Sequence, residues 1–314
     1  MKPSLLNVGR LPPSLEKQLA EAYTLTTLSD VSDPEAFLRE RGAEFTALTS
    51  SAAIGVGRAV IERLPNLRVI SNFGVGLDKV DVAFAQQRGV AVGYTPDVLN
   101  DCVADLAFAL LLDVARGASS ADRFVRAGRW PAGAFPLGRK VSGARLGIVG
   151  MGRIGRTIAR RATGFDMTVR YHTRRPVPEV ELPHEPSLIE LARWCDYLVL
   201  ITAGGPSTHH LINDEVLTAL GPDGFLINVA RGSVVDEAAL VRALQDKRIA
   251  GAGLDVFADE PHVPTELMAL DNVVLLPHIA SATRETRQAM ADRVFDNLQA
   301  FFAGQPLLSV APAA

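Results

Sequence analysis

Three side chains with the chemistry for proton transfer and anion binding follow three successive apolar stretches in the second half of the sequence. They are Arg231, Glu260 and His278, and we predict each stretch before them to be a strand. A guanidinium can bind a carboxylate and polarise a carbonyl, a histidine can donate a proton, and a carboxylate can keep that histidine charged near neutral pH. Each residue alone would ordinarily be structural. Together, and in this order, they form the set required to reduce a 2-oxo acid.

The elements that must position these residues begin at a glycine-rich turn. Gly150, Gly152 and Gly155 have the spacing G-x-G-x-x-G. In dinucleotide-binding folds the first glycine permits a tight turn, the second lets the backbone approach a pyrophosphate, and the third lets the helix pack on the strand. The pattern alone is weakly specific, because glycine-rich turns also serve turn geometry. Here it lies between a predicted buried strand and a predicted helix, so we predict a dinucleotide site.

Strand and helix patterns alternate along most of the chain. Beyond the glycine turn we predict strands at 167–171, 197–202, 224–228, 251–255 and 273–276, with helices at 188–192, 214–220 and 237–245. Before it we predict strands at 5–8, 45–48, 67–71 and 90–94, with helices at 15–23, 58–64 and 82–88, and a last amphipathic helix lies at 284–303. Such alternation predicts parallel sheets with helices on both faces and ligands at the carboxyl ends of the strands.

Two segments depart from this alternation. The helix predicted at 103–114 is apolar almost all round, so we expect it to be buried on most sides, as it would be between two domains. Residues 118–144 are rich in Gly, Pro and Arg and contain Trp130. We expect this segment to be a loose surface loop or an arm that packs on another chain.

A second glycine-rich turn, at 72–78, follows the predicted strand 67–71. Its sequence is Asn-Phe-Gly-Val-Gly-Leu-Asp. Exposed backbone N–H groups in such a turn can hold a small anion such as a carboxylate, although an ordinary strand-to-helix turn is the simpler interpretation.

The residues that would meet the ribose 2′-position favour NADP(H) over NAD(H). An NAD site has an acid at the end of the second strand, about 20 residues beyond the glycines. This sequence has Thr173, Arg174 and Arg175 there, and the nearest acid, Asp166, precedes the strand. Two guanidinium groups and a hydroxyl suit a 2′-phosphate, whereas the alternative is a solvated basic turn.

Composition excludes several classes of function. The 314 residues are 48% hydrophobic, enough for two cores, and the net charge of −3 gives no basic field for nucleic acid or a membrane surface. Cys102 and Cys195 lack metal-ligand spacing, and nothing completes a site with the adjacent His209 and His210, so we predict no metal. We find no signal peptide or membrane span and expect a cytoplasmic protein.

Taken together, these motifs resemble the D-2-hydroxyacid dehydrogenase family, most closely its NADPH-dependent glyoxylate/hydroxypyruvate reductase branch. The resemblance extends over nearly the whole chain, through residues 72–81, 150–155, 228–236 and 277–283. It implies an α/β protein of two doubly wound parallel-sheet domains. A Rossmann nucleotide domain at 97–283 would be inserted into a split, flavodoxin-like substrate domain formed by 1–96 and 284–314.

The resemblance also implies a role for each site residue. Arg231 would bind substrate, Glu260 would pair with the histidine, and His278 would be the general acid in reduction. Substrate would also meet Val75, Gly76, Ser281 and Trp130, of which Val75 and Gly76 form a carboxylate cradle and Ser281 lies beside the histidine. The predicted cofactor-binding residues are Gly150, Gly152, Arg153, Ile154, Gly155, Thr173, Arg174, Arg175, Thr202, Ala230 and Asp255, the last near the nicotinamide carboxamide. Trp130 resembles a tryptophan that reductases of this branch lend to the partner subunit's active site, which implies a homodimer.

Two departures from the family pattern leave the substrate open. Gly204 and Gly205 replace a commonly proline-rich loop, and Leu77 stands where an aromatic residue is frequent. We expect glyoxylate or hydroxypyruvate as substrate, with hydroxyphenylpyruvate or 2-ketogluconate as alternatives. A nucleotide-sensing corepressor of the same family is disfavoured because the sequence has no long disordered tail. Phosphoglycerate dehydrogenase is disfavoured because no regulatory domain follows and the NAD acid is missing.

Overall fold

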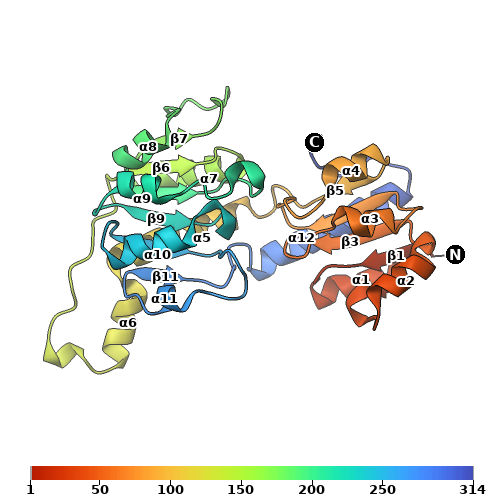
Figure 1. Cartoon of the computed structure of the whole chain (residues 1–314), viewed down its shortest axis with the longest axis horizontal. Coiled ribbons are helices and arrows are strands. Elements are labelled where there is room, and N and C mark those ends of the chain that lie inside the picture. The colour runs from red at the N-terminus through yellow and green to blue at the C-terminus, as the bar shows by residue number, and fades with distance from the viewer. Residues whose placement is uncertain (1, 314) are drawn as a thin grey trace. The chain divides into compact units, whose positions relative to one another are not determined.

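The computed structural model describes residues 2–313, which form two compact units, each built on a parallel β-sheet (Figure 1). Unit 1 comprises Met1–Leu99 and Ala282–Ala314, and unit 2 comprises Asn100–Ser281. These bounds differ by a few residues from the domain boundaries that the sequence predicts, 96/97 and 283/284. Among the described residues, no helix combines the length and the apolar character that crossing a bilayer requires.

Unit 1 has a five-stranded sheet in the order β2-β1-β3-β4-β5. The strands are β1 (Ser4–Asn7), β2 (Thr24–Thr27), β3 (Ala47–Ser51), β4 (Val69–Phe73) and β5 (Ala91–Gly93). The helices are α1 (Pro13–Ala22), α2 (Pro34–Arg41), α3 (Arg58–Glu62), α4 (Val82–Gln87) and α12 (Arg284–Phe302). On one face, Leu6, Leu48 and Ile70 pack with residues of α2, α3 and α4. On the other face α12 packs against β4 and α1.

Unit 2 has a six-stranded sheet in the order β11-β10-β9-β8-β6-β7. The strands are β6 (Arg145–Val149), β7 (Thr168–His172), β8 (Tyr197–Leu200), β9 (Phe225–Asn228), β10 (Gly251–Leu254) and β11 (Val273–Leu275). Its helices are α5 (Asn100–Arg116), α6 (Ala118–Arg126), α7 (Arg153–Ala162), α8 (Leu188–Trp194), α9 (Asp214–Leu220), α10 (Glu237–Gln245) and α11 (Thr265–Met268). The central strands β8, β9 and β10 are buried along their whole length, as a parallel sheet covered on both faces requires.

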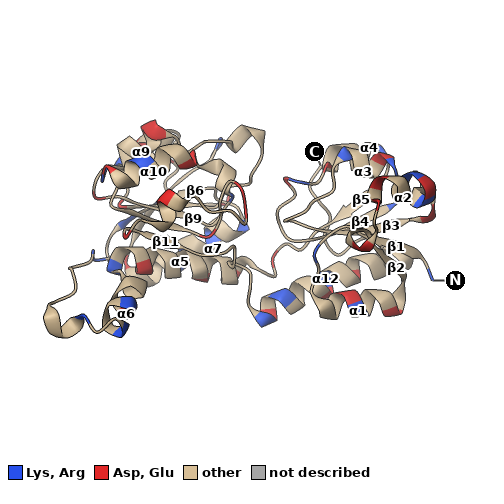
Figure 2. Cartoon of the chain, turned by 60° about the horizontal axis from the view of Figure 1, so that its bottom comes forward, with Lys and Arg blue, Asp and Glu red and all other residues tan. Residues whose placement is uncertain are grey.

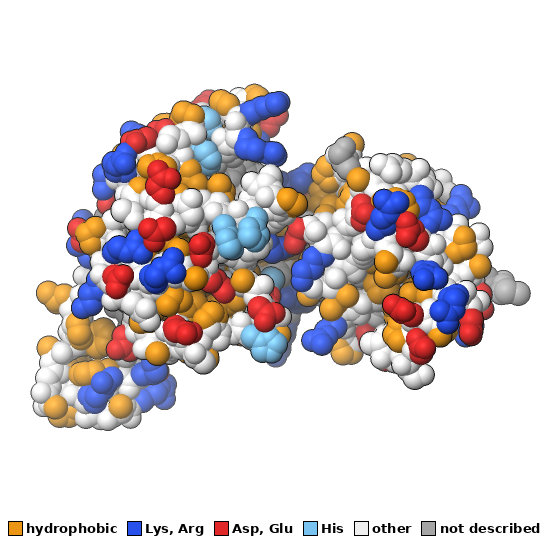
Figure 3. Space-filling view, in the orientation of Figure 1, with side chains coloured by type: hydrophobic (Ala, Val, Ile, Leu, Met, Phe, Trp, Pro, Cys, Tyr) orange, Lys and Arg blue, Asp and Glu red, His pale blue; other side chains and the backbone are white. Residues whose placement is uncertain are grey.

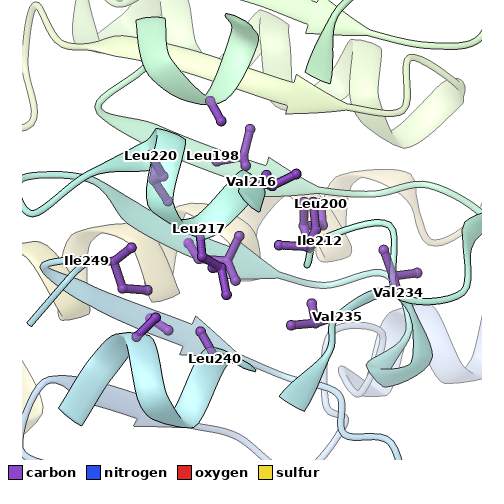
Figure 4. Close-up of a cluster of buried hydrophobic side chains, with 14 of the residues drawn as sticks. Leu198, Leu200, Ile212, Val216, Leu217, Leu220, Val234, Val235, Leu240 and Ile249 are labelled. Atoms are coloured by element: carbon purple, nitrogen blue, oxygen red, sulfur yellow. The ribbon is translucent and has the colours of Figure 1, made fainter. Parts of the chain in front are cut away.

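Helices cover the two faces of the unit 2 sheet in separate groups. On one face, α5 packs against α7 and against β9, β10 and β11. On the other, α8, α9 and α10 enclose the cluster drawn in Figure 4, where Leu198 and Leu200 of β8 meet Val216, Leu217 and Leu220 of α9. This core holds the strands in register, so their carboxyl ends lie along one edge of the sheet.

Four of the strands and α-helices were missed by the sequence patterns, and each has little apolar surface to bury. One is the single turn α11, which buries only Leu267. The strand β2 pairs only with β1 at the edge of its sheet and has no fully buried residue. The helix α2 buries only Leu38. The helix α6 buries no residue at all, carries basic side chains in its last turn (Figure 2), and begins the segment 118–144 that we predicted to lack a core element.

Candidate active site

The glycine turn has the geometry that its spacing predicts, with a different constraint at each glycine. Gly150 has φ +103°, and a Cβ there would lie 2.8 Å from the Thr202 nitrogen. A Cβ on Gly155 would lie 2.2 Å from the Gly150 carbonyl oxygen, so only glycine lets α7 pack this close to the turn. A Cβ on Gly152 would meet nothing within 4 Å. The backbone at Gly152 therefore faces open space, as the approach of a pyrophosphate requires.

The start of α7 adds anion-binding capacity to this turn. Gly152 is the N-cap residue, and no side chain caps the helix. Arg153 and Ile154 belong to the first turn, whose N–H groups lie at the positive end of the helix dipole. These residues fit the diphosphate of a dinucleotide.

The loop after β7 carries the two arginines that we predict to select the nucleotide. Thr173 Oγ1 donates to the Arg175 carbonyl oxygen at 2.7 Å, and both Arg174 and Arg175 are exposed. The Gly150 N–H donates to the His172 carbonyl oxygen at 3.0 Å, so the start of this loop adjoins the glycine turn. No acidic residue occupies positions 173–178.

Two histidines to which sequence reasoning could assign no partner anchor the same loop. His172 Nδ1 donates to the Glu185 carbonyl oxygen, and His184 Nε2 donates to the Thr173 carbonyl oxygen, each at 2.9 Å. Their rings stack with centroids 6.5 Å apart. The two imidazoles therefore fix both ends of the loop that presents Arg174 and Arg175.

Arg231 follows β9 in a turn held by the last residue of that strand. Asn228 is buried, its Oδ1 accepts from the Ala230 N–H, and its Nδ2 donates to the Arg231 carbonyl oxygen, both at 3.0 Å. The next residue, Gly232, packs so closely on the following loop that a Cβ would lie 1.8 Å from the Phe257 carbonyl carbon. The Arg231 turn therefore lies directly against the loop that leads to Glu260.

Glu260 and His278 form a hydrogen-bonded pair. His278 Nδ1 lies 2.7 Å from Glu260 Oε2, and the Phe257 N–H donates to Glu260 Oε1 at 3.1 Å. Burial raises the pKa of Glu260, but the hydrogen bond and charge of His278, the Phe257 N–H and the charge of Arg231 outweigh burial and lower that pKa below its ordinary value. Glu260 is therefore an ionised acceptor for the His278 Nδ1–H, which leaves Nε2 as the nitrogen for proton transfer.

Comparisons with known proteins place this geometry in a family. Residues 108–280 match the family model for the D-isomer specific 2-hydroxyacid dehydrogenase, NAD binding domain. The chain belongs to the D-isomer specific 2-hydroxyacid dehydrogenases. It is therefore an oxidoreductase, and the family and the fold that the sequence predicts are confirmed.

Relatives of known activity are similar to this dehydrogenase over almost its whole length. A 2-ketogluconate reductase from Gluconobacter oxydans is 44% identical over 308 residues, which cover 98% of each chain. A hydroxyphenylpyruvate reductase from Plectranthus scutellarioides is 46% identical over 295 residues, which cover 94% of each. A solved structure of an NADPH-dependent glyoxylate/hydroxypyruvate reductase from Sinorhizobium meliloti, in complex with NADP and malonate, has a TM-score of 0.91 and 42% identity, covering 99% of this chain and 97% of that one.

Asp255 fixes the turn that carries His278 in this dehydrogenase. Its buried carboxylate accepts from the Ile279 N–H at 2.7 Å and from the Ala280 N–H at 2.8 Å. Burial raises the pKa of Asp255 and is only partly offset by these two N–H groups and by the charge of His278. His278 itself has φ +54°, a left-handed conformation uncommon outside glycine, and these bonds hold it there.

The remaining predicted residues divide between the two units. In unit 2, Thr202, Ala230 and Ser281 follow β8, β9 and β11, on the sheet edge that carries Arg231, Glu260 and His278. In unit 1, Val75 and Gly76 follow β4. Trp130 lies in the connection between α6 and β6, with 66% of its surface exposed. The three catalytic candidates Arg231, Glu260 and His278 all belong to unit 2.

Sequence reasoning missed two side chains that shape this edge. The sequence pattern identifies Asn228 only as the end of a strand and Glu237 only as the start of a helix. Glu237 Oε1 accepts from the Ala258 N–H at 2.7 Å and so supports the loop before Glu260. An asparagine at the last position of a fully apolar strand is the signal that could have identified Asn228, because a buried amide must find hydrogen-bond partners.

The sequence predicts that His209 and His210 form a surface pair at the start of a helix. In the structure they lie in a turn, and three residues separate them from the first residue of α9. Both are exposed, and their rings stack with centroids 3.9 Å apart. Figure 3 shows histidine side chains of unit 2 at the molecular surface.

Proposed function

We propose that this dehydrogenase reduces small 2-oxo acids, first of all glyoxylate and hydroxypyruvate, to D-2-hydroxy acids with NADPH. The observation that carries the proposal is the His278–Glu260 hydrogen bond of 2.7 Å, on the sheet edge that also carries Arg231 and the glycine turn. A proton donor, its carboxylate partner and a guanidinium are the groups that reduction of a 2-oxo acid requires.

The proposed mechanism assigns one step to each group. The bound nucleotide supplies a hydride to the carbonyl carbon. Because Nδ1 of His278 is committed to Glu260, protonated His278 gives the Nε2 proton to the carbonyl oxygen. The ionised Glu260 accepts the Nδ1–H of His278 and so fixes the orientation of the imidazole ring. Arg231 binds the substrate carboxylate and polarises the carbonyl group.

Residues of unit 2 would hold the nucleotide. Gly150, Gly152 and Gly155 with the first turn of α7, at Arg153 and Ile154, would bind the diphosphate. Thr173, Arg174 and Arg175 would bind the 2′-phosphate, and a reductase of 42% identity was crystallised with NADP. Thr202, Ala230 and Asp255 would lie at the nicotinamide end, since Ala230 and Asp255 follow strands whose ends carry catalytic groups and Thr202 follows the neighbouring strand β8. We propose that residues 97–283 are the nucleotide domain and that 1–96 with 284–314 are the substrate domain.

The residues that we propose to bind substrate are Arg231, Ser281 and the backbone of Val75 and Gly76. We further propose a homodimer, in which the exposed arm at 118–144 packs on a second copy and Trp130 reaches that copy's active site. Trp130 is 66% exposed and Leu137 fully exposed. A monomer by light scattering at assay concentrations would contradict this arrangement.

Larger 2-oxo acids are the alternative substrates. The hydroxyphenylpyruvate reductase and the 2-ketogluconate reductase are as similar to this chain as the glyoxylate/hydroxypyruvate reductase is. A spectrophotometric panel tests the proposal: NADPH and NADH, each with glyoxylate, hydroxypyruvate, hydroxyphenylpyruvate, 2-ketogluconate and pyruvate. We expect the highest kcat/KM with NADPH and a two- or three-carbon 2-oxo acid. A higher value with 2-ketogluconate or hydroxyphenylpyruvate would reassign the substrate, and no oxidation of either nucleotide would overturn the proposal.

A further inference from the structure

Two buried side chains hold the turn that follows β4 in unit 1. Asn72 Nδ2 donates to the carbonyl oxygens of Gly74 at 3.4 Å and Gly76 at 3.2 Å. Thr95 Oγ1 accepts from the Gly74 N–H at 3.1 Å, and the Thr95 N–H donates to the Gly74 carbonyl oxygen at 3.1 Å. Both Asn72 and Thr95 are completely buried. Four hydrogen bonds thus converge on a turn of three residues.

These bonds decide which way the peptide groups of the turn face. In a trans peptide the C=O and the following N–H point in opposite directions. Because the Gly74 and Gly76 carbonyls are drawn to the buried side chains, the N–H groups of Val75 and Leu77 face away from them. Within residues 2–313, the N–H groups of Val75, Gly76 and Leu77 have no hydrogen-bond partner. The turn therefore offers unpaired donors, which is what a carboxylate needs.

The orientation that lets the Asn72 amide hold both carbonyls leaves its own oxygen without a hydrogen-bond partner. Only the NH2 group of the amide can donate to the two carbonyls, so Oδ1 must point away from them. There Oδ1 is buried and has no hydrogen-bond partner among the described residues. An unpaired buried acceptor is unfavourable, and a residue needed only to fill space would avoid it. The turn is also sterically fixed, since Gly74 has φ +144° and a Cβ there would lie 2.5 Å from the Ala52 Cβ.

The position of Thr95 is itself set from the far end of the chain. The carbonyl oxygen of the preceding residue, Tyr94, accepts from Ser309 Oγ at 2.6 Å and from Asn297 Nδ2 at 3.4 Å. Both donors are buried, and Asn297 belongs to α12. Thr95 is therefore held by the C-terminal helix and tail as well as by the sheet.

We propose that Asn72 and Thr95 are positioning residues for the substrate carboxylate, because they hold the Gly74 and Gly76 carbonyls inward and so turn the N–H groups of Val75 and Leu77 outward. The inference rests on the proposed function, in which Val75 and Gly76 form the carboxylate cradle. Both side chains are neutral, so they orient the donors without adding a charge that would compete with or repel the substrate.

The test compares Thr95→Val and Asn72→Ala with a matched control, Ser71→Ala. Ser71 is equally buried, adjoins Asn72 and donates to the Val294 carbonyl oxygen at 3.1 Å, away from the turn. We expect KM for the 2-oxo acid to rise about tenfold in each test variant, the effect of about one hydrogen bond, while kcat and KM for NADPH stay unchanged. Thr95→Ser, which keeps the hydroxyl, should restore KM, and Ser71→Ala should lower stability without raising KM.

Malonate affinity, measured by calorimetry on the same variants with NADPH present, gives a readout independent of turnover. The wild type should bind malonate, and Thr95→Val should bind it about tenfold more weakly. Wild-type turnover combined with an unchanged KM in Thr95→Val, or an equal rise in Ser71→Ala, overturns the positioning role and leaves the proposed function standing. If the wild type reduces no 2-oxo acid, the proposed function fails, and malonate binding alone decides the inference: weaker binding in Thr95→Val supports it, and unchanged or absent binding overturns it.

Discussion

The two sheets of this dehydrogenase have the same parallel arrangement, yet the side chains at their carboxyl ends differ in kind. Unit 2 places ionisable groups there, among them Arg231, which is partly buried, and Glu260 and His278, which are exposed. Unit 1 places neutral polar groups there, among them Asn72 and Thr95, and they are completely buried.

The difference follows from what each edge has to do. Proton transfer requires groups that change charge, and such groups need partners and access to solvent, because an isolated charge is very unfavourable in the interior. Orienting backbone donors requires only hydrogen bonds, which neutral side chains can make while fully buried. We therefore expect substitution of His278 in unit 2 to change the rate of the chemical step and substitution of Asn72 or Thr95 in unit 1 to change substrate binding.

The largest effect should come from His278→Ala. Loss of the proton donor should lower kcat by about 10²- to 10⁴-fold and leave NADPH binding nearly unchanged, because proton donation acts in the transition state. Steady-state kinetics and a fluorescence titration of NADPH measure the two quantities. His262→Ala is the matched control, since that side chain is 80% exposed and pairs only with Asp259, at 3.4 Å. An unchanged kcat would show that His278 is not the proton donor. The proposed difference in role between the carboxyl-end edges of the two sheets would then be wrong.

A smaller effect, confined to the nucleotide, is expected when Arg174 and Arg175 are both changed to Ala. Two lost charge-assisted contacts should raise KM for NADPH by about 100-fold and leave KM for NADH within about twofold. The double change Arg39→Ala and Arg41→Ala on α2 removes the same charge from unit 1 and should affect neither nucleotide. Equal losses for NADPH and NADH would mean that the loop after β7 does not contact the 2′-phosphate.

The smallest expected effect is on the stability of the fold at acid pH, where Glu260 and Asp255 of unit 2 should act in opposite directions. The pKa of Glu260 is lowered in the fold, so its stabilisation is present above the ordinary value of 4.5 and is lost as the pH falls through the lower, folded pKa. The pKa of Asp255 is raised, so its charge opposes folding at neutral pH, and this penalty is relieved as the pH falls.

Thermal unfolding at a series of pH values tests this sign. The wild type should lose its advantage over Glu260→Gln, a few degrees in Tm, as the pH falls below 4.5. As the pH falls through the raised pKa of Asp255 toward its ordinary value of 3.8, the wild type should gain relative to Asp255→Asn. Parallel curves for both variants would show that neither carboxylate is shifted as described.

Local sequence patterns predicted the structure correctly where a steric or burial requirement allows only one type of residue at a position. The glycine spacing at 150–155 predicted a turn whose three positions have three different constraints in the structure. The helices at 214–220 and 237–245 begin and end where the pattern predicts, because acidic and amide N-caps, Asn213 and Asp236, precede strong apolar repeats.

Elsewhere the pattern carried too little signal. The edge strand β2 and the helices α2 and α6 bury almost nothing, so no apolar period marks them. Partners distant in sequence were also beyond reach. His184 meets Thr173 across the turn of a loop, and Asp255 meets Ile279 and Ala280 only because β10 and β11 are neighbours in the sheet.

By itself the sequence determined the family, the alternation of strands and helices and the residue types available for chemistry, since these depend on side-chain character and on spacing along the chain. The tertiary structure decided which of those side chains meet. Glu260 and His278 are paired because parallel strands end at one edge of a sheet. The N–H groups of Val75 and Leu77 face outward because Asn72 and Thr95 hold the Gly74 and Gly76 carbonyls. A hydrogen bond needs a donor–acceptor distance of about 3 Å. Only folding brings atoms of residues that are distant in the sequence to within that distance.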